Sequence, residues 1–343
     1  MRLRRSDLTG RGIRRVRAGR SFRYLDWAGE PVPADEVIRI KELVIPPAWR
    51  DVWICPWPNG HIQAVGFDAA GRRQYLYHPR WREKRDQVKH DHVLDFAAAL
   101  PGLRETVTGE LAGRGLSRER VLAAAVRLLD LGFFRVGGER YADDNGTYGL
   151  ATLHREHVSM SRGEIVFCYP AKGGYERVQA IAEPQVCRVI RALRSRASDG
   201  DPLWAYYQHG RWHQVHSTEV NDYLKDRTGL DVSAKDFRTW NATVLAAVGL
   251  AVSPVPRRSA SSRKRAIARV VKEVSEYLGN TPAVCRASYI DPRVIERYGR
   301  GDTIADALDQ LGEVTSGSLA IQGPVEEAVL NLLRPGGAKE RQP

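Results

Sequence analysis

The chain has 343 residues, more than a single domain usually contains, which favours two domains. Hydrophobic residues make up 43% and aromatic residues 8%, as in globular proteins with well-formed cores. Lys and Arg total 53 against 41 Asp and Glu, and the formal net charge of +12 favours a polyanionic partner such as nucleic acid without specifying one.

Several features of the sequence argue against other classes of protein. The four cysteines are far apart and form no CxxC pair, so neither a disulfide framework nor a zinc ribbon is expected. No apolar run approaches the ~18 residues of a membrane span. The arginine-rich N-terminus has no apolar segment behind it, unlike a secretory signal. We expect a cytoplasmic protein without a membrane partner.

The N-terminal part of the chain predicts a small β-rich domain, residues 1–80. Its first twenty residues contain eight arginines and form either a flexible, solvated arm or a basic arm that follows a phosphate backbone; the sequence leaves both open. Alternating apolar and polar residues predict strands at 52–55, 61–67 and 74–77. The charged stretch 82–92 is expected to contain the domain boundary.

Helical periodicity dominates the sequence after this boundary. Ser117 is typical of a helix N-cap, and its helix is expected to stop at Gly132. Ser233 opens a capping-box pattern and a helix that runs to about residue 250. Another helix is expected at about 263–278.

Two features interrupt or follow these helices. Two strand-like runs flank the segment PAKGG within residues 163–180, which predicts a hairpin with Lys172 at its tip. We assign residues 81–315 to a mainly helical domain and 316–343 to a C-terminal tail that contains a short helix, around 325–333.

Five separated segments carry residues suited to phosphate chemistry. They are FFRVG (133–137) with Arg135, PAKGG (170–174) with Lys172, KDFRT (235–239) with Arg238, GNTP (279–282) with Asn280, and ASYIDP (287–292) with Tyr289. At these residues the chain resembles the poxvirus-like, or bacterial, type IB DNA topoisomerases. Each motif is weak alone, but all five occur in family order and in matching hairpin and helix contexts.

The resemblance covers nearly the whole chain, from IRIKELVIPPAW (38–49) to about residue 304. It implies an α+β fold, with a small N-terminal β-rich DNA-binding domain and a larger, mainly α-helical catalytic domain of the type IB topoisomerase and tyrosine recombinase kind. The two domains would form a C-shaped clamp around double-stranded DNA.

The implied activity is that of an isomerase that relaxes positive and negative supercoils as a monomer. Tyr289 would cut one strand and hold it as a 3′-phosphotyrosyl intermediate while the free 5′ end rotates. Because the bond energy stays in the phosphotyrosine, neither ATP nor a metal nor another cofactor is expected. The sequence has no GxxxxGK[ST] loop and no acidic cluster at metal spacing.

The chemistry explains why these residue types are needed. A five-coordinate phosphorus concentrates negative charge, and the guanidinium groups of Arg135 and Arg238 can grip its non-bridging oxygens; losing one such donor typically costs ~10²–10³ in rate. Asn280 would add a neutral hydrogen bond. Tyr289 is the nucleophile, and a cationic pocket must help it ionise. Lys172 suits a general acid that protonates the leaving 5′-oxygen.

Two departures from related families bear on this interpretation. Many relatives carry His where this chain has Asn280, and no His follows His216. An amide can donate a hydrogen bond but cannot hold charge or shuttle a proton, so Asn280 is interpreted as a stabiliser only. Tyrosine recombinases usually place His three residues before the second arginine, where this chain has Lys235, which favours the topoisomerases.

The resemblance also assigns DNA contacts. Gln74, Tyr75 and Tyr77 match a family strand that enters the major groove, where amides and phenols can reach base edges. Cross-strand aromatic packing fits Tyr77 about as well. Lys235 is expected to contact a base or phosphate near the cleavage site, with a solvated helix-terminal lysine as the alternative.

Each of these residues also has an ordinary structural explanation. Taken singly, Tyr289 is a packing residue, Lys172 a solvated turn lysine, and Asn280 a residue typical of a helix end. Their joint occurrence in family order favours the catalytic interpretation. The alternative functions are a tyrosine recombinase or integrase, which joins different DNA partners as an oligomer, and a non-catalytic DNA-binding protein.

Overall fold

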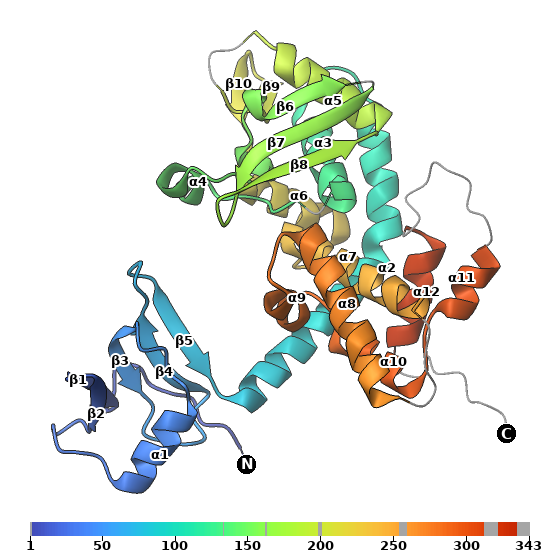
Figure 1. The fold of residues 1–343 in the computed structure, drawn as a ribbon. Coiled ribbons are helices and arrows are strands. Elements are labelled where there is room, and N and C mark those ends of the chain that lie inside the picture. Colours follow the sequence, from blue (N-terminus) through green and yellow to red (C-terminus); the bar gives the residue numbers. More distant parts are fainter. Residues whose placement is uncertain are drawn as a thin grey trace. The chain divides into compact units, whose positions relative to one another are not determined.

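The computed structural model describes residues 2–132, 134–161, 163–197, 201–253, 259–311 and 322–334. The chain divides into two compact units, Met1–His90 and Asp91–Pro343 (Figure 1). The division lies inside the charged stretch 82–92, within the long helix α2 (Pro79–Leu111). A β-rich first unit and a mainly helical second unit confirm the predicted fold class.

The first unit is built on a five-stranded antiparallel sheet of order β2-β1-β3-β4-β5. The strands are β1 (Ile13–Ala18), β2 (Ser21–Leu25), β3 (Arg50–Ile54), β4 (Ile62–Phe67) and β5 (Arg73–Tyr77). Ile40 of helix α1 (Ala34–Glu42) shares a small core with the sheet residues Ile13, Val52, Ile54 and Ala64. The expected alternation is observed in β5, where exposed residues alternate with partly buried ones, whereas residues 62–66 of β4 are all buried.

Residues 13–18 of the arginine-rich N-terminus form strand β1 of this sheet, so the flexible, solvated arm considered for the first twenty residues is wrong there. Contact of this segment with a phosphate backbone stays a prediction. β1 and β2 form an antiparallel hairpin that turns at Gly19, where φ is 61°. Arg15 shows how a basic strand is accommodated, because its guanidinium donates to the carbonyl oxygens of Ile45 and Trp49 at 3.2 and 2.7 Å. A group with five donors can satisfy buried backbone acceptors and still keep its charge.

The second unit is mainly helical and buries one large hydrophobic core. Its further helices are α3 (Arg118–Gly132), α4 (Glu139–Asn145), α5 (Pro184–Ser195), α6 (Ser217–Thr228), α7 (Ala234–Ala251), α8 (Ala260–Leu278), α9 (Pro282–Ser288), α10 (Pro292–Arg300), α11 (Ala305–Leu311) and α12 (Pro324–Leu333), with short 3₁₀ turns at Leu150–Thr152 and Arg155–His157. Most side chains of α3 and α7 are buried. Helix α7 packs against α8, which in turn contacts α9 (orange in Figure 1).

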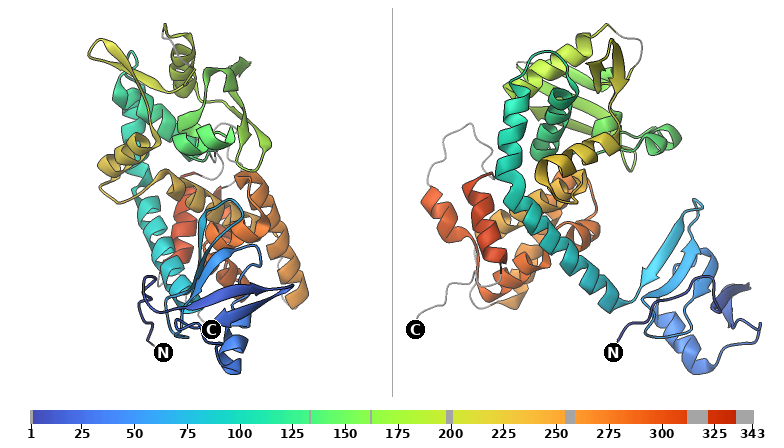
Figure 2. Two further views of the ribbon diagram at one scale, coloured as in Figure 1. Left: turned by 90° about the vertical axis from the view of Figure 1, so that its left-hand side faces the viewer. Right: turned by 180° about the vertical axis from the view of Figure 1, so that it is seen from behind.

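Two small antiparallel sheets complete the second unit. One has the order β6-β7-β8, with β6 (Val158–Ser161), β7 (Glu164–Ala171) and β8 (Tyr175–Ile181); the other pairs β9 (Ala205–Gln208) with β10 (Arg211–Gln214). Helix α3 packs on β8 and α5 packs on β7, an arrangement visible from several sides in Figure 2. The three-stranded sheet is thereby fixed to the helical core.

The local signals in the sequence predicted several of these elements correctly. Ser117 precedes α3 and its Oγ accepts from the Arg120 N–H at 3.4 Å. Ser233 precedes α7, and its N–H donates to Asp236 Oδ2 at 2.8 Å, as in a capping box. The predicted hairpin is formed by β7 and β8, with Lys172 in its turn. Helix α8 begins at Ala260, slightly earlier than predicted.

The predicted C-terminal helix is observed as α12, and it belongs to the core of the second unit. Val325, Val329, Leu330 and Leu333 are buried in that core, and α12 packs against α7 and α10. The other residues of the expected tail, 316–321 and 335–343, lie outside the described residues.

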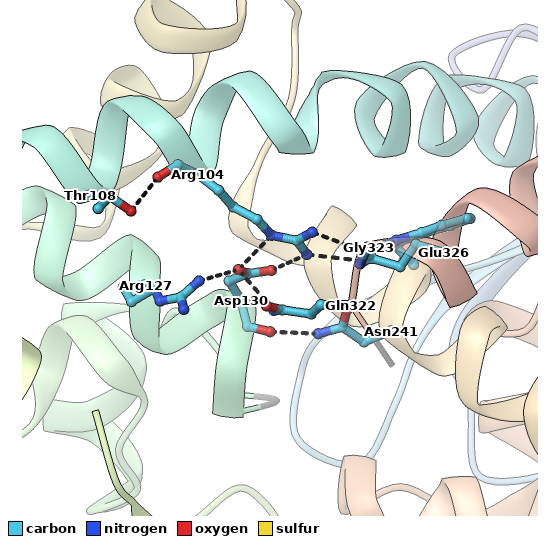
Figure 3. A network of polar contacts seen from close by, with 9 residues as sticks. Arg104, Thr108, Arg127, Asp130, Asn241, Gln322, Gly323 and Glu326 are labelled. Atoms are coloured by element: carbon cyan, nitrogen blue, oxygen red, sulfur yellow. Dashed lines mark hydrogen bonds and ion pairs between the residues drawn. The ribbon is translucent and has the colours of Figure 1, made fainter. Parts of the chain in front are cut away.

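A buried polar network fastens α12 to α2, α3 and α7 (Figure 3). The Arg104 guanidinium donates to both oxygens of Asp130 at 2.9 and 2.8 Å, and to both oxygens of Glu326 at 2.6 and 3.0 Å. Trp240 Nε1 also donates to Glu326, at 2.8 Å. Glu326 Oε1 accepts from both Arg104 of α2 and Trp240 of α7, so this side chain connects the C-terminal helix to both of these helices.

Replacing Glu326 with Ala is expected to lower the free energy of unfolding by about 3 kcal/mol, because Arg104 loses one of its two carboxylate partners and Trp240 Nε1 loses its acceptor. Urea unfolding measures this change. Glu327, an exposed neighbour on the same helix, provides the control, and Glu327→Ala should change stability by less than about 0.5 kcal/mol. Equal effects of the two substitutions would contradict a special role for the network.

Candidate active site

Two adjoining cavities in the second unit bring together the residues predicted for catalysis. The larger, of about 1290 Å³, is lined by the β7–β8 hairpin and the C-terminal end of α8; the smaller, of about 300 Å³, by residues 135–138 and the start of α7. Arg135, Lys172 and Arg238 line both cavities. Asn280 lines the larger and Tyr289 the smaller. Five segments far apart in the sequence therefore meet at one site.

Buried aromatic packing places Arg135 at the edge of these cavities. The preceding residue, Phe134, is buried against Phe167 and Tyr169 of β7, with ring centroids 5.0 and 6.3 Å apart. Phe133 of the same motif lies outside the described residues. The apolar side of the motif is thus anchored in the core, and Arg135 is left at the cavity wall.

The backbone around Arg135 is fixed by a close approach of two glycines. The Arg135 carbonyl accepts from the Leu150 N–H at 2.7 Å. A Cβ atom on Gly149 would lie only 2.5 Å from backbone atoms of Gly137, and Gly137 itself has a φ of 85°. Only glycine fits such a contact, which explains why the segment after Arg135 is glycine-rich.

The end of α8 is capped in a way that shapes the cavity wall. Gly279 adopts a left-handed φ of 60°, and its N–H donates to the Glu276 carbonyl at 3.1 Å. The Asn280 N–H donates to the Ser275 carbonyl at 3.0 Å. This pattern is a common glycine-terminated helix end. These two bonds satisfy the carbonyl groups of Ser275 and Glu276. The carbonyl groups of residues 277–279 remain available to side chains.

Two arginines use those remaining carbonyls. Arg238 Nη2 donates to the Leu278 carbonyl at 2.8 Å, and Arg135 Nη2 donates to the Gly279 carbonyl at 2.8 Å. The end of a helix carries partial negative charge, which stabilises cations placed there. The two guanidinium groups are therefore held close together although they repel each other.

Asn280 adds a neutral donor to this pair. Arg135 Nη2 donates to Asn280 Oδ1 at 2.6 Å. Because a guanidinium only donates, the amide oxygen must face Arg135 and the NH₂ group must point elsewhere. Asn280 Nδ2 is buried and has no hydrogen-bond partner among the described residues. A buried donor without an acceptor fits an anionic oxygen bound in the cavity.

Arg238 is the most buried member of the site, with 3% of its surface exposed. Burial lowers the pKa of its guanidinium, and the charge of Arg135 lowers this pKa further, whereas Tyr289 raises it. An arginine stays protonated at neutral pH despite such a shift. Arg238 is thus a desolvated permanent cation, a form in which electrostatic attraction to an anion is strongest.

Tyr289 is positioned by helix α7, which also carries Arg238. Tyr289 follows α9 directly, and its N–H donates to the Cys285 carbonyl at 3.0 Å. The buried hydroxyl of Thr243 on α7 accepts from the Asp291 N–H at 3.1 Å. Its proton faces two carbonyl oxygens, that of Thr239 at 2.8 Å and that of Tyr289 at 3.2 Å. One hydroxyl thereby holds the backbone at and after Tyr289 against the helix of Arg238.

The surrounding charges favour the ionised form of Tyr289. Burial raises the pKa of its phenol, but the charge of Arg238, a hydrogen bond with Arg238, and the charges of Arg135 and Lys235 lower it, and the net pKa is lowered. The Arg238 guanidinium carbon lies 5.3 Å from the centroid of the Tyr289 ring. The site therefore combines a phenol of enhanced acidity with adjacent cations.

Two exposed lysines border the smaller cavity. Lys172 lies at the tip of the β7–β8 hairpin, followed by Gly173 and Gly174 with φ values of 101° and 79°. These left-handed conformations allow the tight turn that presents the lysine. Lys235 lies in the first turn of α7 and is also exposed.

The predicted DNA-contacting residues of the first unit divide between the two faces of β5. Tyr75 and Tyr77 are 36% and 39% exposed and stack on each other, with centroids 6.0 Å apart. Gln74 lies on the opposite face because side chains alternate along a strand, and its Nε2 donates to Asp68 Oδ2 at 2.9 Å. The two tyrosines form a common surface, which Gln74 does not share.

Three further residues of the site were missed in the sequence. Thr243 gave no signal, because nothing in the sequence distinguishes it from the other buried residues of α7. Tyr148 lines both cavities, and its ring lies 5.0 and 4.4 Å from those of His154 and His157. Arg177 lines the larger cavity, and its burial follows the inward alternation of β8. A polar residue at an inward position of a strand is the signal that could have identified it.

The part of the chain that the structure describes was also searched for other kinds of site. It contains no group of three or more His, Cys, Asp and Glu side chains that could hold a metal ion. None of its helices is both long and apolar enough to span a lipid bilayer.

Comparison with known protein families identifies the family of this chain. Residues 78–313 match the family described as the catalytic core of eukaryotic DNA topoisomerase I, and residues 21–68 match the N-terminal domain of bacterial DNA topoisomerase IB. The first match covers more than half of the chain. The chain belongs to the type IB DNA topoisomerases. Membership of this family makes it an isomerase that binds DNA.

The viral relatives of the topoisomerase match most of its length. DNA topoisomerase 1B of Acanthamoeba polyphaga mimivirus is 29% identical over 296 residues, 84% of this chain and 87% of the relative. DNA topoisomerase I of Monkeypox virus is 22% identical over 282 residues, 80% of this chain and 84% of the relative. DNA topoisomerase 1 of Daucus carota is 32% identical over 131 residues, 37% of this chain and 15% of the relative. The viral similarity is long enough to include both units.

The cations around Tyr289 give the topoisomerase a testable pH dependence. Because they lower the pKa of Tyr289 below the usual value of about 10, the acidic limb of the pH–rate profile for strand cleavage should level off below that pH. Lys235→Ala removes one of these charges, so the Tyr289 pKa should rise and the acidic limb should shift to higher pH. Single-turnover cleavage of a saturating oligonucleotide duplex measures both profiles.

Lys272 provides the matched control, because it is an exposed lysine of α8 that lines neither cavity. Lys272→Ala should leave the profile in place. An equal shift in both variants, or none in Lys235→Ala, would contradict a local effect of Lys235 on the phenol.

Proposed function

We propose that this topoisomerase relaxes positive and negative supercoils by cutting one strand of duplex DNA with Tyr289. The phenolic oxygen attacks the scissile phosphorus, and the bond from phosphorus to the 5′-oxygen breaks, so that the cut strand is held through its 3′-phosphate. The free 5′ end rotates, and its hydroxyl then attacks the phosphotyrosine and releases Tyr289. The proposal is carried by one observation: a phenol with a lowered pKa shares a cavity with Arg135 and Arg238.

Arg135 and Arg238 are assigned to the negative charge that develops on the phosphorus. Both are held before DNA arrives by carbonyl groups at the end of α8, so little reorganisation is needed when the phosphate enters. The Asn280 Nδ2 donor, which has no partner among the described residues, is assigned to a non-bridging oxygen. Its neutral amide stabilises charge without taking part in proton transfer.

Lys172 is assigned as the general acid. An aliphatic alkoxide is far more basic than a phenolate, so the 5′-oxygen needs a proton as its bond to phosphorus breaks. Lys172 lies at the hairpin tip, in the wall of both cavities that Arg135 and Arg238 also line. In the resealing step the phenolate is already a good leaving group and needs no acid.

The same chemistry makes external energy unnecessary. The phosphotyrosine keeps the energy of the broken bond, so cutting and resealing need no ATP. The arginines and Lys172 supply the positive charge for transition-state stabilisation, and we therefore propose a metal-independent reaction. We also propose that a monomer acts on the nucleoid in the cytoplasm, with Tyr75, Tyr77 and Lys235 contacting the DNA. Gln74 would first have to release Asp68 to take part.

The protein is expected to relax a supercoiled plasmid in EDTA and without ATP, and Tyr289→Phe is expected to abolish relaxation and the covalent adduct while leaving DNA affinity unchanged. The substitution removes only the nucleophilic oxygen. Agarose gels follow relaxation, and denaturing gels detect the adduct. Relaxation by Tyr289→Phe would exclude the tyrosine mechanism, and strand joining between two duplexes in place of relaxation would favour a recombinase.

Lys172→Ala is expected to slow strand cleavage by about 10²- to 10⁴-fold, the range typical of a lost general acid. A substrate whose bridging 5′-oxygen is replaced by sulfur should restore the rate, because a thiolate leaves without protonation. Arg135→Ala is the matched control, since it should be slow on both substrates. Failure of the sulfur substrate to rescue Lys172→Ala would count against the general-acid role.

A further inference from the structure

Three guanidinium groups, rather than two, meet the end of α8. Arg177 of β8 donates from Nη2 to the Tyr277 carbonyl at 2.7 Å. Arg238 and Arg135 bind the next two carbonyls along the chain, each at 2.8 Å. Three consecutive carbonyl oxygens at one helix end thus hold arginines from three separate segments. The partial negative charge of this end stabilises all three.

Arg177 occupies this position at an electrostatic cost. It is half-buried in the wall of the larger cavity, and its Nε donates to Gln179 Oε1 at 2.9 Å. Burial lowers the pKa of Arg177, Tyr169 raises it, and the nearby charge of Arg135 lowers it, so that the net pKa is lowered. No described carboxylate forms an ion pair with either arginine. A cation that is removed from water and lies beside a like charge lowers the stability of the folded protein. Such a residue is expected to be kept for a role other than stability.

Arg177 also packs on the backbone that carries Asn280. A Cβ atom placed on Gly279 would lie 3.0 Å from Arg177 Nη1, so the guanidinium lies directly against this glycine. Arg135 holds the same two residues through the Gly279 carbonyl and Asn280 Oδ1. Gly279, the residue before Asn280, is therefore contacted by two arginines, and Arg177 has no part in the proposed chemistry.

We infer that Arg177 is a positioning residue for strand cleavage, acting through the last turn of α8 on Arg135 and Asn280. The inference rests on the proposed function. By binding the Tyr277 carbonyl, Arg177 fixes the turn whose following carbonyls orient Arg238 and Arg135. Guanidinium groups bind two oxygens of a phosphate only in a defined plane, and a displacement of about 1 Å can reduce a rate by about 10²-fold.

The test compares Arg177→Ala and Arg177→Lys in the full-length protein. Cleavage of a saturating duplex under single-turnover conditions should be slower by about 10- to 100-fold in Arg177→Ala, while the Kd for DNA and the Tm stay near those of the unsubstituted protein. Arg177→Lys keeps one donor for the Tyr277 carbonyl and should recover part of the rate. Arg191→Ala, which removes an exposed arginine of α5, is the control and should cleave normally.

A double-mutant cycle distinguishes positioning from simple loss of stability. If Arg177 acts through Asn280 and Arg135, Arg177→Ala should slow cleavage far less in an Asn280→Ala background than in the unsubstituted protein. Fully additive losses would overturn the inference. Should Arg177→Ala fail to fold, the same cycle is run with Arg177→Lys and Arg177→Gln.

Other outcomes also overturn the inference. Normal cleavage by Arg177→Ala would do so, as would a loss confined to DNA affinity or to the Tm. None of these results would affect the proposed function, because that function is tested separately by Tyr289→Phe in the same cleavage assay.

Discussion

The negative end of α8 is the feature on which the site depends. Guanidinium groups repel one another, and bringing three of them together needs a fixed acceptor for each. The carbonyls of residues 277–279 supply these acceptors, while the two before them are satisfied by the backbone of Gly279 and Asn280. Rigid carbonyls orient the arginines without neutralising their formal charge. The pocket therefore keeps a positive potential that is available to a phosphate.

A second constraint comes from helix α7, which joins the phosphate-binding and nucleophilic sides of the site. Arg238 reaches the end of α8, and Thr243, one and a half turns later, binds the backbone around Tyr289. Between them Trp240 donates to Glu326 of α12. Helix α7 is therefore hydrogen-bonded to α8, to the segment around Tyr289 and to α12. Of these partners, α12 lies beyond residues 78–313, the part of the chain that matches the topoisomerase catalytic core. The C-terminal helix adds a support for α7 that the catalytic-core match does not include.

Local signals explain what the sequence could predict. Capping residues such as Ser117 and Ser233, and the glycines that follow Lys172, act within a few residues, so they indicated helix starts and the hairpin correctly. The five candidate catalytic residues were found through family motifs and lie around adjoining cavities, although their roles stay proposals. The N-terminal hairpin was missed, and its contacts with the rest of the sheet are long-range: β1 pairs with β3, and Arg15 donates to carbonyls some thirty residues away. The roles of Arg177 and Thr243 were missed because the bonds that define them, to the Tyr277 carbonyl and from the Asp291 N–H, join segments far apart in the sequence.

A crystal structure of the protein trapped on a duplex that cannot be resealed would test the central claim most directly. We predict a covalent bond between Tyr289 Oη and the 3′-phosphorus, with Arg135, Arg238 and Asn280 donating to its non-bridging oxygens at about 3 Å. A phosphorus bonded to another residue, or a phosphate bound away from both arginines, would contradict the account.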